Sequence, residues 1–127
     1  MPDLNQLKQK YQPVIDTIQS FSPQGASVGN VALDGDKLLL QASVPSPVVA
    51  NRVWDVIKQV DPSYSDLHHE ITTTGSTQSY TIQSGDNLSK ISKHFYGDAN
   101  KYQKIAQANG IVDANKIQAG QTITIPA

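Results

Sequence analysis

The sequence predicts an α+β protein of two small domains, and three observations predict it. Apolar residues recur at helical spacing in two segments of the first 60 residues. Between these segments, Asp34-Gly35 separates two apolar runs, which is the strongest short-range signal for a β-hairpin. A polar tract at residues 72–79 then divides a 127-residue chain, whose length fits one average domain or two small ones.

The first expected element is an amphipathic helix over residues 4–21. Because a proline inside a helix removes a hydrogen bond and clashes with the preceding turn, Pro13 predicts a kink there or a fresh start near Gln12. Ser22-Pro23-Gln24-Gly25 is a turn cluster that ends the helix. The apolar stripe consists of Leu4, Leu7, Tyr11, Val14, Ile15, Ile18 and Phe21.

Two strands are expected next, over residues 28–33 and 38–44, joined by the Asp34-Gly35 turn. Alternate residues of the second strand are apolar, which predicts that one face of the sheet is buried. The residues on that face are Leu38, Leu40, Ala42 and Val44.

A second helix should follow, because Ser46 has the position of an N-cap and Pro47 that of the first helical residue. Asp61-Pro62 ends this helix, and alternation over residues 67–73 predicts a third strand. The order αββαβ fits a three-stranded sheet covered on one face by two helices.

The second unit is expected to run strand, helix, helix, strand, with the strands paired antiparallel and both helices on one face. Tyr80 and Ile82 alternate in the first strand, and Ile123 and Ile125 in the last. The first helix is expected to bury Leu88, Ile91 and Phe95. We expect Asp86 or Asn87 to cap this helix and Gly97 to end it. Asn100 should cap the second helix, and Gly110 should end it.

We place the first domain at residues 1–74, a linker at 75–78 and the second domain at 79–127. Residues 1–75 carry five basic and eight acidic side chains, and residues 76–127 carry five and three, so the halves are net −3 and +2. Opposite charges predict a weak electrostatic attraction between the two domains, screened by salt.

Composition excludes several classes of function. The net charge of −1, without any basic cluster, argues against nucleic acid as a partner. The absence of cysteine removes disulfides and thiolate chemistry, and no apolar run is long enough to span a membrane. The N-terminus lacks the apolar run of a secretory signal, so we expect a cytoplasmic monomer, with the cell envelope as the alternative.

Spaced motifs in the second unit resemble those of a LysM domain over nearly all of residues 79–127. They read YTIQSGDNLS at residues 80–89, Ile91, YG at 96–97, Ile105, AN at 108–109 and IQAGQTITIP at 117–126. Asn87 departs from the family, which usually has Thr there, but asparagine also caps helices. The first unit resembles a BON domain through its element order and hairpin, and the whole arrangement is similar to small bacterial potassium-binding proteins.

The LysM resemblance implies a non-catalytic module that binds glycans containing N-acetylglucosamine, such as peptidoglycan or chitin, in a shallow groove. Carried over by position, the groove falls on Gly85, Asp86, Asn87, Leu88 and Ser89 on one side and Asn109, Gly110, Ile111 and Val112 on the other. Leu88, Ile111 or Val112 offers an apolar seat for an acetyl group. The structural alternative is that the two glycines serve turns, Leu88 the core, and Asp86 and Asn87 the helix cap.

The alternative function is a cytoplasmic potassium-binding protein. A ring of neutral backbone carbonyls suits potassium and needs no diagnostic side chain. If potassium is bound, we expect carbonyls near Ile71, Thr73 and Gly75, where the chain leaves the sheet. No other cofactor is expected.

Other chemistry has little support in the sequence. His68 and His69 would point to opposite faces of a strand, so His68-His69-Glu70 is a poor metal site. His94 is expected at the surface, and Tyr11 and Trp54 on the apolar sides of their helices rather than as sugar-stacking rings. No nucleophile elbow, phosphate loop or metalloprotease motif is present, so we expect no enzyme activity.

Overall fold

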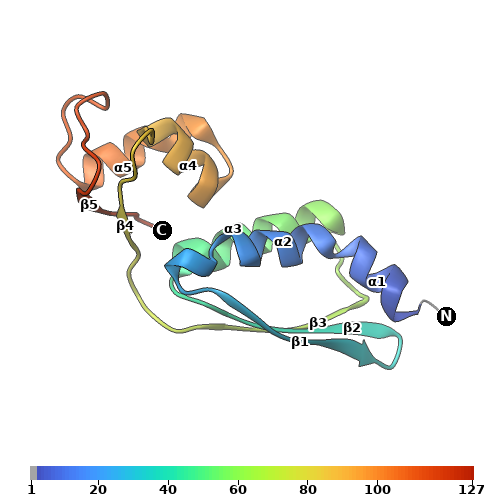
Figure 1. The fold of residues 1–127 in the computed structure, drawn as a ribbon. Coiled ribbons are helices and arrows are strands. Elements are labelled where there is room, and N and C mark those ends of the chain that lie inside the picture. The colour runs from blue at the N-terminus through green and yellow to red at the C-terminus, as the bar shows by residue number, and fades with distance from the viewer. Residues whose placement is uncertain (1–2) are drawn as a thin grey trace.

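The computed structural model describes residues 3–127 and contains two sheets, a three-stranded sheet in the order β1-β2-β3 and a two-stranded sheet of β4 and β5. Figure 1 shows two units, the first with its helices over one face of its sheet. The predicted α+β class, with the orders αββαβ and βααβ, is confirmed.

The N-terminal helical segment is broken, as Pro13 predicts. Helix α1 (Leu4–Lys10) ends at Tyr11, and α2 (Gln12–Ser20) begins there with the proline in its first turn. Asp3 caps α1 through a hydrogen bond from the backbone N–H of Gln6. A short 3₁₀ turn, η1 (Ser22–Gln24), then leads into the sheet.

The first sheet combines an antiparallel hairpin with a parallel crossover. Strand β1 (Ser27–Asp34) pairs antiparallel with β2 (Lys37–Val44), and Gly35 takes a φ of +64° in the turn. Helix α3 (Pro47–Val60) carries the chain back, so that β3 (Leu67–Thr73) pairs parallel to β2. The predicted inward face of β2 is confirmed, since Leu38, Leu40, Ala42 and Val44 are all buried.

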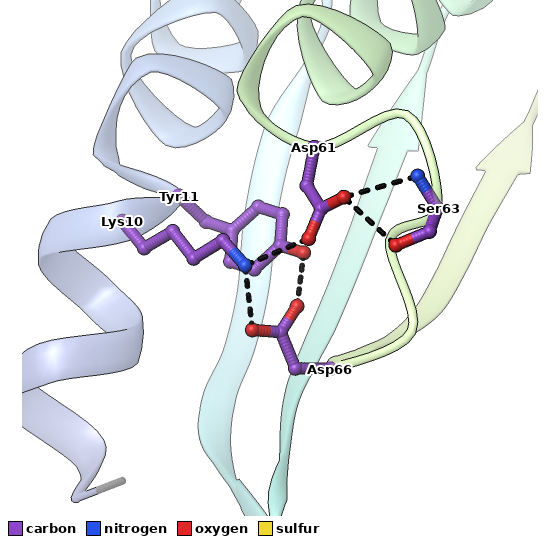
Figure 2. Close-up of polar contacts among 5 residues, drawn as sticks. All are labelled: Lys10, Tyr11, Asp61, Ser63 and Asp66. Atoms are coloured by element: carbon purple, nitrogen blue, oxygen red, sulfur yellow. Dashed lines mark hydrogen bonds and ion pairs between the residues drawn. The ribbon is translucent and has the colours of Figure 1, made fainter.

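A polar cluster joins the α1–α2 junction to the loop between α3 and β3 (Figure 2). The Lys10 ammonium lies 2.8 Å from Asp61 Oδ2 and 2.7 Å from Asp66 Oδ2, and the Tyr11 hydroxyl donates to Asp66. Hydrogen bonds from Lys10 and Ser63 lower the pKa of Asp61 to about 2. Burial alone would raise the pKa of Asp66, but the hydrogen bonds from Lys10 and Tyr11 outweigh it and lower that pKa.

The second unit pairs β4 (Ser79–Thr81) with β5 (Thr122–Thr124), antiparallel as predicted. Asn87 caps α4 (Leu88–Tyr96), which ends at Gly97 with a φ of +75°. The prediction that Asn100 caps the next helix is wrong. The N-cap position of α5 (Tyr102–Ala108) is Lys101, which makes no side-chain capping hydrogen bond. Asp98 caps the preceding 3₁₀ turn η2 (Ala99–Lys101), because its carboxylate accepts from the N–H of Asn100.

Apolar contacts and a buried hydrogen bond hold the two units together. The Phe21 ring lies 4.3 Å from the His94 ring and 5.4 Å from the Phe95 ring, centroid to centroid. His94 is therefore half-buried at the interface, so its expected surface position is wrong. Burial lowers the pKa of His94, and the nearby Arg52 charge adds to this effect.

Among residues 3–127, no ion pair joins the two units, so the predicted charge attraction does not take the form of a direct salt bridge. The four ion pairs found among residues 3–127 all lie within the first unit. Instead, the Ser46 hydroxyl donates a 2.8 Å hydrogen bond to the buried amide oxygen of Gln78.

The segment between the sheets is tied to the first unit. The backbone N–H and side-chain hydroxyl of Thr74 both donate to the carbonyl of Val44. A Cβ at Gly75 would lie only 2.6 Å from the carbonyl oxygen of Pro45, so glycine permits this close approach. These contacts hold the segment against the first unit. The domain limits at residues 74 and 79 remain a prediction.

Candidate functional site

The turn between β4 and α4 holds the first five residues that the LysM resemblance implies. Gly85 has a φ of +87°, a backbone conformation that favours glycine whether or not a ligand is bound. The Asp86 carboxylate accepts hydrogen bonds from the Tyr80 hydroxyl at 2.6 Å and from the Gln83 N–H at 2.7 Å. Asn87 accepts from the N–H of Lys90 as the helix cap. These polar side chains hold the turn itself.

Leu88 and Ser89 have opposite environments. Leu88 is 1% exposed and belongs to the core, so its side chain does not offer an apolar seat to a ligand. Ser89 is exposed. Of the implied residues on this side, Ser89 thus has the most accessible side chain that makes no structural hydrogen bond.

Asn109, on the other side, joins the end of α5 to β5. Its amide nitrogen donates to the carbonyls of Ile105 and Thr124, and its amide oxygen accepts from the N–H of Thr124, all at 2.8 Å. Three hydrogen bonds of about 1 kcal/mol each make this side chain a structural link. It has little capacity left for a sugar.

The residues after Asn109 are open to a ligand. Gly110 takes a φ of +65° and turns the chain. Ile111 is half-buried against the core, while Val112 is fully exposed, with a relative accessibility of 102%. An exposed valine next to a half-buried isoleucine is an apolar surface that nothing in the described chain covers.

Val112 lies in an open hollow of about 520 Å³ between α5 and the loop that follows it. Residues 85–89 do not line this hollow, so the two implied groups do not share it. The lining consists of Tyr102, Gln103, Ala106 and Gln107 from α5, with residues 111–115 from the loop.

The hollow combines apolar and amide surfaces with little charge. Tyr102 and Ala106 are half-buried on one wall, and Gln103 and Gln107 are exposed on it. Asp113 is the one carboxylate in the lining, and it accepts from the N–H of Asn115 at 2.9 Å. Sequence reasoning missed Gln103 and Gln107, which carry no motif.

The two neighbouring histidines of β3 do face opposite ways. His68 is exposed, with Nδ1 2.5 Å from a carboxylate oxygen of Asp34, whereas the ring of His69 packs edge-on against Trp54 at 4.6 Å. Within residues 3–127 no three His, Cys, Asp or Glu side chains are grouped as metal ligands. No helix in the same range is long and apolar enough to cross a membrane.

Comparison with known proteins finds similarity to binding proteins and to esterases. The chain is 35% identical over 77% of its length to the potassium binding protein Kbp of Escherichia coli, and spans 64% of that protein. It is 43% identical over 47 residues to a chitin elicitor-binding protein of Oryza sativa, 13% of whose length is matched. It is also 48% identical over 65 residues to an esterase of Mycobacterium tuberculosis, 14% of whose length is matched.

The chain therefore spans less than two thirds of each of these relatives. The model of the LysM domain family matches residues 80–126, which include α4, α5, β5, all of β4 but its first residue, and both groups of implied residues. Residues 80–126 of this chain are a LysM domain.

Proposed function

We propose that the chain is a non-catalytic protein that binds a glycan containing N-acetylglucosamine, chitin or peptidoglycan, in the hollow beside α5. The observation that carries this proposal is the full exposure of Val112 in a hollow that also contains Tyr102 and two glutamines. Small-ligand sites usually combine apolar and aromatic surface with a few polar groups that fix the ligand's orientation. The matched chitin elicitor-binding protein supports a chitin-like ligand.

Each part of an N-acetylglucosamine unit has a counterpart in the hollow. The acetyl methyl fits against Ile111 and Val112, and a sugar face fits against the ring of Tyr102. The amides of Gln103 and Gln107 are both donors and acceptors, as sugar hydroxyls and the acetamido group require. Asp113 is a single carboxylate, whereas most glycoside hydrolases need two, so the proposed outcome is binding.

The test is retention on insoluble chitin and on purified peptidoglycan. Val112→Ser should reduce the bound fraction about tenfold, because it removes apolar surface worth roughly 1.5–3 kcal/mol when buried. Its melting temperature should stay unchanged, since Val112 makes no core contact.

Leu33→Ser is the matched control, because Leu33 is the other exposed large apolar residue among residues 3–127, is 45% accessible, and lies on β1 of the first unit. This variant should bind as the parent does. Equal loss in both variants, or no loss in either, would show that the hollow is not the glycan site.

A second candidate function is potassium binding, which we propose on the similarity to the potassium binding protein Kbp because that match, over 100 residues, must extend into both units. The backbone of the segment near Ile71, Thr73 and Gly75, where carbonyl ligands are predicted, supports this second function. Thr73 is paired with Val44 in the sheet, and Gly75 lies against the carbonyl of Pro45, so two stretches of backbone meet there.

Potassium should therefore raise the melting temperature and shift amide resonances near Ile71, Thr73 and Gly75, since a ligand that binds only the folded state stabilises it. Sodium at the same ionic strength should have a much smaller effect. Identical melting curves and spectra in the two salts would remove this candidate and leave the glycan proposal intact.

A further inference from the structure

A small cavity lies where α3 of the first unit meets α4, η2 and α5 of the second. Its volume is about 120 Å³, and its lining includes the charged side chains of Arg52, Asp55, Lys101 and Lys104. Phe95 and Tyr96 contribute aromatic surface. The LysM hollow beside Val112 shares none of these residues.

Arg52 enters this cavity from the first unit. Its guanidinium packs against Gly97, where an added Cβ would lie 2.8 Å from the guanidinium carbon. Half-buried Arg52 makes no hydrogen bond or ion pair with another residue of the described chain, and Asp55, one turn along α3, is not within ion-pair distance. The interface thus positions a guanidinium and leaves its donors without an acceptor.

Two further cations come from the second unit. Lys101 and Lys104 are exposed and form no ion pair among residues 3–127, and the Lys104 ammonium lies 5.4 Å from the centre of the Tyr96 ring. Three positive side chains face the carboxylate of Asp55 and the terminal carboxylate of Ala127, so the lining carries a net charge of +1. Like charges repel, so an anion between these groups would be favourable.

We propose that this cavity binds one phosphoryl group, as inorganic phosphate or as the end of a phosphate ester. The cavity is small and is lined by one arginine and two lysines, which suits a tetrahedral oxyanion. The fork of an arginine matches two phosphate oxygens, and lysines supply point charges around them.

Binding there would bridge the two units. Arg52 belongs to α3, whereas Lys101 and Lys104 belong to η2 and α5, so the anion would contact both. Phosphate should therefore stabilise the docked arrangement of the full chain.

The experiment follows melting of the full-length chain in inorganic phosphate, in glycerol 3-phosphate and in chloride at matched ionic strength. Phosphate at about ten times its Kd should raise the melting temperature by about 5 °C relative to chloride. Arg52→Gln should abolish the rise, and so should the double change Lys101→Gln with Lys104→Gln, which alters only exposed side chains and should fold normally. Lys58→Gln, at an exposed position on α3 outside the cavity, is the matched control and should keep it.

The site is supported if phosphate raises the melting temperature of the parent and of Lys58→Gln but not that of the cavity variants. Whichever probe, inorganic phosphate or glycerol 3-phosphate, gives the larger rise shows whether the site prefers free phosphate or a phosphate ester. The same rise in every variant would mean a nonspecific salt effect and overturn the proposal. The absence of a rise with both probes would overturn it too. Neither outcome depends on glycan retention, which is measured separately.

Discussion

Phe21→Ala is expected to lower the free energy of unfolding by about 3–5 kcal/mol, the usual cost of removing a buried aromatic ring. Phe21 is only 1% exposed and packs against His94 and Phe95 of the other unit. The loss therefore falls on the contact between the units as well as on the first core.

The measurement pairs thermal or denaturant unfolding with an NMR titration of His94. Burial lowers the pKa of His94 in the parent, so removing the Phe21 ring should move that pKa up toward its ordinary value of 6.5. Phe21→Leu is the control, because a large apolar side chain keeps most of the burial and should cost less than about 1.5 kcal/mol. An unchanged pKa in Phe21→Ala would show that the two units do not dock in this way.

Local sequence patterns predicted most of the fold. The helical stripe and Pro13 indicated two helices that meet near Tyr11, and Ser46-Pro47 marked the start of α3, because these signals act within one or two turns of chain. The pattern also showed that Phe21 would be buried. It did not show that Phe21 would lie against His94, since periodicity gives the buried face of a helix but not the element that covers it.

The candidate site was harder to predict because it depends on side-chain exposure in irregular chain. The segment after α5 has no periodicity, so its path, and with it the full exposure of Val112, could not be derived from spacing. Asn109 illustrates the same limit, because its hydrogen bonds to Ile105 and Thr124 join residues that only the fold brings together. The position of Asn109 in the motif does not show whether its side chain contacts a ligand or holds the fold together.

The environment of Arg52 shows a further limit of sequence reasoning. Gly97 was expected to end a helix, and it does so with a φ of +75°. The same glycine also leaves room for the Arg52 guanidinium of the other unit. Nothing local to either residue indicates this contact, because it arises from the docking of the two units.

Leu88→Ala should separate the two roles assigned to Leu88, a core residue and an acetyl seat. The side chain is 1% exposed at the start of α4, so its truncation should cost about 2–5 kcal/mol of stability through lost burial and a new cavity. Retention on chitin, measured well below the lowered melting temperature, should equal that of the parent, because the hollow beside Val112 does not include Leu88.

Ser89→Ala is the matched control, since Ser89 is the exposed neighbour on the same turn of α4 and should change stability by less than about 0.5 kcal/mol. The Leu88→Ala and Val112→Ser variants are compared in both measurements. Leu88→Ala should lower stability without changing chitin retention, and Val112→Ser should lower chitin retention without changing stability. The measurement is made at a temperature where the spectrum of Leu88→Ala matches that of the parent, so that the variant is folded. If the folded variant loses chitin retention, the glycan site lies at the turn between β4 and α4 and not in the hollow beside Val112.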